Sequence, residues 1–158
     1  TGSLPKALCD AGHDVSIIMP LYRDVEKAGN FKWISGEFLT SAGESFGLAE
    51  SVIPGTSIPA YFVSKEEYFH RPGIYGPDNA SAFHDNALRF SFFCRAVVAF
   101  QESLGKPPDI IHCHDWQTGL IPAYMRNSIR PAVVFTIHNM HFQGNFPAEE
   151  YVYTFLPR

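Results

Sequence analysis

The stretch PDIIHCHDWQTGL (residues 108–120), followed by AVVFTIHN (residues 132–139), decides the fold of this chain. A short buried strand is predicted near the start of each stretch, at 109–112, which contains Ile110 and Ile111, and at 132–137, which is rich in β-branched residues. We expect a helix between them, from about residue 116 to residue 127. A strand, a helix and a second strand in this order predict a βαβ unit on a parallel sheet, with a right-handed crossover.

The rest of the chain alternates in a similar way. We expect a helix at 4–11, capped by Gly12, then a strand at 15–19 and weaker strands within 31–40 and 58–63. Residues 64–85 look like a loop. A long helix begins near Asp85, with an apolar stripe at Phe90, Phe93, Val97, Phe100 and Leu104, and it ends before Gly105 and Pro107. The pattern predicts an α/β fold with a doubly wound sheet.

Composition excludes several classes of function. The 158 residues include 12 Lys and Arg and 16 Asp and Glu, so the net charge is −4. Since no basic run occurs, we expect no nucleic-acid partner. No apolar run approaches the ~18 residues that a membrane span needs, so we expect no membrane partner either. The three cysteines are odd in number and lie in apolar stretches, which argues against a disulfide framework and for a reducing, cytosol-like compartment.

Two polar segments follow the two best-defined strands. Ligands of open α/β sheets bind beyond the carboxyl ends of the strands. HCHDWQTG (residues 112–119) follows the first strand and HNMHFQG (residues 138–144) follows the second. Four of the seven histidines lie in these two segments. We therefore expect the candidate site at this edge of the sheet.

Each polar residue there also has a structural interpretation. Asp115 precedes a helix, so one interpretation is that it serves only as an N-cap for the amides two or three residues later. His112 lies inside a strand pattern and fits a packed, hydrogen-bonded core residue. Trp116 fits a core or stacking position. His138 and Asn139 have no packing reason to follow a strand, which makes them the stronger functional candidates.

Metal and nucleophile chemistry receive less support. His112 and His114 form a His-x-His pair after a strand, which is how several metal-dependent hydrolases begin their sites, but the spacing offers too few convergent ligands for zinc. A metal-dependent hydrolase stays open as an alternative. Cys113 adjoins His114, yet adjacency in sequence is not the spatial pairing that nucleophilic catalysis needs. No G-x-G-x-x-G, Walker A or G-x-S-x-G motif is present.

Taken together, five segments resemble the N-terminal catalytic domain of bacterial glycogen synthases and plant starch synthases. In chain order they are GSLPKAL, GHDV and MPLY within 2–22, EEYFHRPGIYG at 66–76, DNALRFSFF at 85–93, PDIIHCHDWQTGL at 108–120 and TIHNMHFQG at 136–144. Residues 23–60 carry little of the resemblance.

The resemblance implies a Rossmann-like lobe of a two-lobed glycosyltransferase of the GT-B type. The implied reaction is retaining transfer of glucose from ADP-glucose to the non-reducing end of an α-1,4-glucan, without a metal or other cofactor. His138 matches the histidine near the transferred glucose that activity requires. Asp115 matches an acidic residue that contacts the sugar or acceptor, Asn139 follows His138 in the same loop, and Tyr75 matches a tyrosine at the mouth of the active site.

The resemblance also implies missing parts. The family's Lys-x-Gly-Gly-Leu loop should precede the GSLP segment, where only Thr1 stands, and the C-terminal lobe with its phosphate-binding Arg and Lys is absent. We therefore expect an incomplete, catalytically incompetent piece, whose partners are a nucleotide sugar, an α-glucan and the missing lobe. The expected location is the cytoplasm, or the plastid in a plant. A non-catalytic glucan-binding module stays open as a second alternative.

Overall fold

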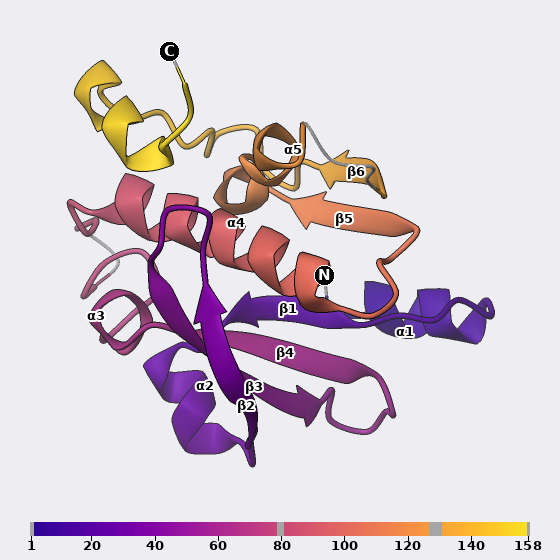
Figure 1. Ribbon diagram of the computed structural model, residues 1–158. Helices are drawn as coiled ribbons and strands as arrows, with labels where there is room; N and C mark the ends of the chain where they lie inside the picture. The colour runs from indigo at the N-terminus through magenta and orange to yellow at the C-terminus, as the bar shows by residue number, and fades with distance from the viewer. Residues whose placement is uncertain (1, 79–80, 127–130, 158) are drawn as a thin grey trace. The chain divides into compact units, whose positions relative to one another are not determined.

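The computed structural model describes residues 2–78, 81–126 and 131–157. The chain divides into two units, each described by itself: the first is Thr1–Glu37 with Phe46–Ile74, and the second is Phe38–Ser45 with Tyr75–Arg158. Figure 1 labels the helices and strands of both. Among the described residues, no helix is long and apolar enough to cross a membrane.

A four-stranded mixed sheet organises the first unit, in the order β1-β4-β3-β2. Strand β1 pairs in parallel with β4, and β4 pairs antiparallel with β3. The strands are β1 (Ile17–Pro20), β2 (Lys32–Leu39), β3 (Ser45–Val52) and β4 (Pro59–Ser64). The helices of this unit are α1 (Leu4–Asp10), α2 (Arg23–Ala28) and α3 (Glu66–Phe69).

The α/β class expected from the sequence is confirmed, with one parallel strand pair, β1 and β4, in this sheet. Helix α1 and strands β1, β2 and β4 lie within about two residues of their predicted places, and Gly12 has the positive φ expected of a cap, 92°. Helix α2 was not predicted, and α3 lies within residues 64–85, which were expected to be a loop. Strand β3 and its antiparallel pairing were not predicted either. Its residues include Gly47, Ala49 and Glu50, which have low β-propensity, and it forms because tertiary burial overrides that preference.

The core of the first unit is a small apolar cluster on this sheet. Leu21, Ala49, Ala60 and Phe62 are buried, and Ile17, Met19, Val25, Phe31 and Ile53 pack against them. The ring of Phe31 meets that of Phe62 edge-on, at a centroid distance of 4.9 Å.

The second unit is built on one long helix and one parallel strand pair. Its elements are α4 (Asn86–Ser103), β5 (Ile110–His114), η1 (Trp116–Thr118), α5 (Ile121–Tyr124), β6 (Ala132–Thr136) and η2 (Ala148–Thr154). Strands β5 and β6 pair in parallel, with His114 opposite Thr136. Helix α4 contacts η1, α5 and η2. Phe90, Phe93, Val97 and Phe100 of the predicted apolar stripe are buried, whereas Leu104 follows the end of α4 and is 36% exposed. The buried surface is also wider than the stripe, because Phe92 and Arg89 are fully buried too.

The helix predicted at 116–127 is broken into two short pieces. Element η1 ends at Thr118, and α5 runs only from Ile121 to Tyr124. Pro122 lies in the first turn of α5, where its missing N–H costs nothing, but its ring would clash in a helix continuous from residue 116. The predicted end at Asn127 lies outside the described residues.

A buried arginine connects three segments of the second unit. The Arg95 guanidinium donates to Glu44 Oε2 through Nε at 3.0 Å and through Nη2 at 2.6 Å. Its Nη1 donates to the Tyr153 carbonyl at 2.9 Å, and the guanidinium lies 4.7 Å from the centre of the Phe155 ring. The Arg95 side chain is fully buried. Through these contacts it links α4 to Glu44 and to the C-terminal segment.

Candidate functional site

The segments that follow β5 and β6 are joined at the carboxyl end of the strand pair. The Asp115 amide donates to the Thr136 carbonyl at 2.9 Å, and the His138 amide donates to Asp115 Oδ1 at 2.7 Å. Parallel neighbours bring their carboxyl ends to the same edge. The expected meeting of the two polar segments is therefore confirmed by the strand pairing.

Asp115 does not act as the helix cap that the sequence allowed. Its side chain makes no capping hydrogen bond to η1, since Oδ1 accepts from the His138 amide instead. The backbone of Asp115 has φ 58° and ψ −177°, a conformation that residues other than glycine rarely adopt. This backbone conformation directs the carboxylate toward the segment after β6, where it accepts the hydrogen bond from the His138 amide.

Three histidine rings form a column at this edge. The rings of His112 and His114 stack at a centroid distance of 4.3 Å, and those of His114 and His138 at 5.2 Å. Nδ1 of His114 lies 3.0 Å from Nε2 of His138, and Nε2 of His112 lies 2.7 Å from the Thr136 hydroxyl. Burial lowers the pKa of His114, and the neighbouring His112 and His138 lower it further. His112 is thus a partly buried, hydrogen-bonded residue, as expected.

Asn139 shapes the loop after β6. Its Oδ1 accepts from the His141 amide at 2.9 Å, and its carbonyl accepts from the Phe142 amide at 3.2 Å. The side chain therefore closes a local turn. Asn139 is exposed and directly follows His138 in the same loop.

Tyr75 is held against the segment after β5. Its hydroxyl accepts from Gln117 Nε2 at 2.8 Å, and its carbonyl accepts from Asn86 Nδ2 at 2.9 Å. Its ring lies 6.4 Å from that of Trp116. Burial raises the pKa of Tyr75, so its hydroxyl is neutral at pH 7 and can both donate and accept hydrogen bonds. The structure thus connects Tyr75 to the turn that contains Asp115.

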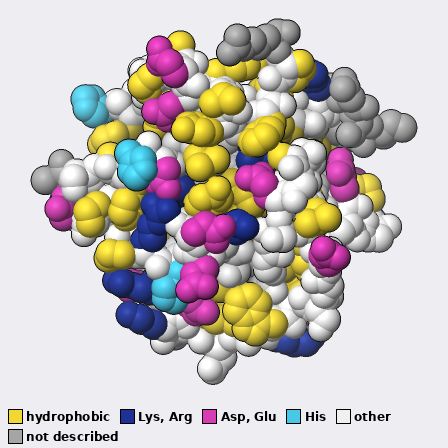
Figure 2. Space-filling view, turned by 60° about the vertical axis from the view of Figure 1, so that its left-hand side comes forward, with side chains coloured by type: hydrophobic (Ala, Val, Ile, Leu, Met, Phe, Trp, Pro, Cys, Tyr) yellow, Lys and Arg dark blue, Asp and Glu magenta, His cyan; other side chains and the backbone are white. Residues whose placement is uncertain are grey.

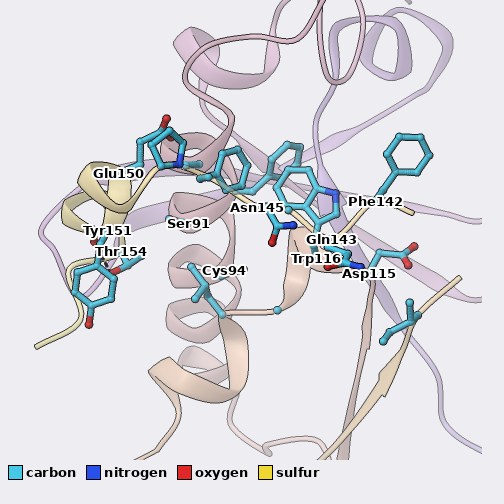
Figure 3. A pocket seen from close by; sticks show the side chains of 18 of the residues that line it. Ser91, Cys94, Asp115, Trp116, Phe142, Gln143, Asn145, Glu150, Tyr151 and Thr154 are labelled. Atoms are coloured by element: carbon cyan, nitrogen blue, oxygen red, sulfur yellow. Dashed lines mark hydrogen bonds between the residues drawn. The ribbon is translucent and has the colours of Figure 1, made fainter. Parts of the chain in front are cut away.

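A cavity of about 820 Å³ adjoins this edge (Figure 3). Asp115 lines it, whereas His138, Asn139 and Tyr75 do not. Figure 3 shows Trp116 and Gln143 toward one end and Glu150, Tyr151 and Thr154 toward the other, with Cys94 of α4 between. Most of the wall is apolar, and Trp116 packs on Phe90 and Phe146 at centroid distances of 4.9 and 5.4 Å. The expectation that Trp116 serves as packed wall is confirmed.

Neither a metal centre nor a cysteine nucleophile fits this geometry. Among the described residues, no group of three His, Cys, Asp or Glu side chains is arranged to hold a metal ion. Only two imidazole nitrogens approach one another, because Nε2 of His112 is directed to Thr136, and a zinc site needs at least three protein ligands. Cys113 is buried, and burial raises the pKa of its thiol, which disfavours the reactive thiolate.

Three residues with a part in the site were not assigned that part from the sequence. Gln117 holds Tyr75, and His114 contacts His138. The sequence drew attention to His114 in the histidine-rich segment, in a His-x-His pair and beside Cys113, but not as a partner of His138. Gln117 carried no signal because its partner lies 42 residues away. Gly144 is a third case: its φ is 66°, and a Cβ there would lie 2.7 Å from the Trp116 ring.

Comparison with known proteins assigns this arrangement to a family. A model of the starch synthase catalytic domain matches residues 1–158. A glycogen synthase of Geotalea daltonii is 39% identical over 162 residues, which cover 96% of this chain and 33% of that protein. Glycogen synthase 2 of Geobacter sulfurreducens is 41% identical over 167 residues, covering 99% and 34%.

A solved structure agrees with these relatives. The catalytic domain of starch synthase IV from Arabidopsis thaliana, bound to ADP and acarbose, matches with a TM-score of 0.78 and 29% identity. The match covers 98% of this chain and 33% of that one. The chain thus spans about a third of the length of the proteins it matches. It belongs to the family of starch synthase catalytic domains.

Proposed function

We propose that this chain is part of the N-terminal lobe of a retaining glucosyltransferase. The reaction is transfer of glucose from ADP-glucose to the 4-hydroxyl at the non-reducing end of an α-1,4-glucan, as in glycogen and starch synthesis. Membership of the family supports the reaction class. The similarity to a starch synthase bound to ADP and acarbose supports a nucleotide and a glucan-like sugar as ligands.

The proposal rests on the two hydrogen bonds that fix His138. Its amide is bonded to Asp115 and its ring to His114, so an exposed loop histidine is fixed at two points. Rigid placement of a group beside the reacting sugar is worth more to catalysis than its intrinsic acidity when the leaving group is already good. His138 is accordingly the proposed catalytic residue, with Asp115, Asn139 and Tyr75 binding the sugar.

The described residues of the site can stabilise the positive charge that develops on the sugar, but not the negative charge that develops on the diphosphate. Breaking a glycosyl–phosphate bond leaves positive charge on the sugar and negative charge on the diphosphate. The Asp115 carboxylate supports the cationic side. None of the described residues that line the cavity is Lys or Arg, and the buried Arg95 is paired with Glu44. We propose that a second lobe supplies the cations for the diphosphate, and that residues 1–158 alone do not turn over.

Exposed apolar side chains after β6 support the proposal that another domain covers this edge of the sheet. Ile137, Met140 and Phe142, which follow β6, are exposed by 58%, 73% and 64%. Figure 2 shows hydrophobic side chains on the molecular surface among acidic and basic ones. Large exposed apolar side chains grouped in one segment are typical of surfaces that another domain or protein covers.

The test is glucosyl transfer to glycogen by the complete protein that the gene encodes. ADP-glucose and UDP-glucose are compared, with and without EDTA, and His138→Ala is compared with His141→Ala. His141 is a matched control, since it is an exposed histidine three positions later in the same loop. We expect EDTA-resistant transfer, favoured with ADP-glucose, that is lost in His138→Ala and kept in His141→Ala.

Other outcomes overturn the proposal in distinguishable ways. Oligosaccharide binding without transfer from either donor would indicate a glucan-binding module. Hydrolysis without glucosyl transfer, abolished by EDTA and restored by zinc, would indicate a metal-dependent hydrolase. Steady transfer by residues 1–158 alone would contradict the need for a second lobe.

A further inference from the structure

The hydrogen bond between two histidines uses one nitrogen of each ring. Nδ1 of His114 and Nε2 of His138 lie 3.0 Å apart, within ordinary hydrogen-bond distance. This bond leaves Nδ1 as the only ring nitrogen of His138 available to a substrate. Because the bond defines the rotation of the ring, it also defines the direction in which that nitrogen can act.

We propose that His114 is a positioning residue, which sets the ring orientation of His138 for glucosyl transfer. The inference rests on the proposed function and adds a residue to it. His114 and Asp115 are consecutive, so the end of β5 holds both the ring and the amide of His138. The ring of His114 is itself supported by stacking on His112, which the Thr136 hydroxyl holds in turn.

A single proton must lie between the two nitrogens for the bond to exist. Two imidazolium rings would place two N–H groups head to head and break it. Among the residues that the structure describes, the charged and titratable groups that act on His114 are His112, His138 and Asp115. Burial and the two histidines lower the pKa of His114 and outweigh Asp115, which acts in the opposite direction. His114 therefore stays neutral near pH 7, and the pair keeps its bridging proton.

Two substitutions separate hydrogen bonding from packing. His114→Phe keeps a ring that can stack on His112 but removes the nitrogen. His114→Asn removes the ring but places an amide oxygen where Nδ1 stood. The matched control is His141→Asn, because His141 is an exposed histidine of the same loop whose ring lies edge-on to that of Phe142. All are made in the complete protein, and kcat and KM are measured for ADP-glucose and glycogen.

We expect His114→Phe to lower kcat about 10- to 100-fold with little change in either KM, as for a misplaced catalytic group. His114→Asn should stay within about threefold of wild type, and so should the control. In a His138→Ala background, His114→Phe should have no further effect, because its action passes through His138. If packing were the role, His114→Phe would be active and His114→Asn would not.

Nuclear magnetic resonance of the ¹⁵N-labelled protein gives a readout independent of activity. A ¹⁵N–¹⁵N coupling across the hydrogen bond should join His138 Nε2 to His114 Nδ1 in the wild type and be absent in His114→Phe. Coupling without any transfer would overturn the proposed function, and the positioning role with it. Transfer without coupling, a reversed order of the two variants, or additive losses with His138→Ala would overturn the positioning role alone.

Discussion

The buried ion pair of the second unit gives a prediction that does not depend on activity. We expect Glu44→Ala to destabilise the chain more than Arg95→Met, although both break the same pair. The reason is the difference in burial. The Arg95 side chain is fully buried, whereas 22% of the Glu44 side chain is exposed. Removing Glu44 leaves a cation without water or counter-charge, and removing Arg95 leaves a carboxylate that water can reach.

The magnitude follows from that asymmetry. Breaking a buried pair by removing one partner costs roughly 3–5 kcal/mol, and the partial exposure of Glu44 puts Glu44→Ala at the lower end, about 3 kcal/mol. Arg95→Met keeps the volume and removes the charge, so we expect a loss of about 1–2 kcal/mol from the missing hydrogen bonds. In the Arg95→Met background, Glu44→Ala should then cost less than about 1 kcal/mol.

Urea unfolding can measure these differences. The chain has two tryptophans, Trp33 and Trp116. In a Trp33→Phe background the fluorescence of Trp116 reports on the second unit, which contains the pair. With a slope of about 2 kcal/mol per molar urea, a loss of about 3 kcal/mol moves the midpoint by about 1.5 M. Equal losses for the two single variants, or additive losses in the double variant, would refute the reasoning.

Three further predictions concern the candidate site. Asp115→Gly should change the free energy of unfolding by less than about 1 kcal/mol, because relief of backbone strain offsets the lost hydrogen bond, yet kcat of the complete protein should fall at least about tenfold; retained activity would contradict this. Gly144→Ala should destabilise the chain by about 2–3 kcal/mol in urea, since its Cβ would lie 2.7 Å from the Trp116 ring at a φ of 66°. Because the pKa of His114 lies below its usual value of 6.5, the folded state binds fewer protons than the unfolded state there. Stability should therefore decrease as the pH falls below about 6.5, and thermal melts between pH 5 and 7 should show a weaker decrease for His114→Asn than for wild type.

The fold was predictable where local pattern and burial agree. Strands β5 and β6 are short β-branched runs bounded by turn residues, and α4 shows an unbroken helical period before Gly105. Strand β3 was not predictable, because Leu48 and Ala49, both fully buried, stand among residues that disfavour strands. Its position depends on pairing with β4, which is information about tertiary structure.

The sequence was enough to predict where the site lies, at the carboxyl edge of the strands. It was not enough to predict the contacts within the site. The placement of two polar segments after parallel strands was enough to bring Asp115 and His138 together. The partner atoms were not accessible to the same reasoning. Asp115 satisfies the sequence pattern of a helix cap, but in the structure its Oδ1 accepts from the His138 amide instead, and its backbone adopts dihedral angles that no local preference favours.

The conformation of Asp115 is itself an argument that this position serves more than stability. A backbone in this region costs a residue other than glycine roughly 1–3 kcal/mol, and a hydrogen bond to a charged group returns about 1.5–3 kcal/mol. The two terms nearly cancel, so a glycine would give the same stability with less strain. What glycine lacks is the carboxylate, which holds the His138 amide at 2.7 Å and puts negative charge beside the proposed sugar site. Stability alone does not explain why a strained aspartate stands here instead of glycine. We infer that the Asp115 carboxylate serves to place His138 and to put negative charge beside the reacting sugar.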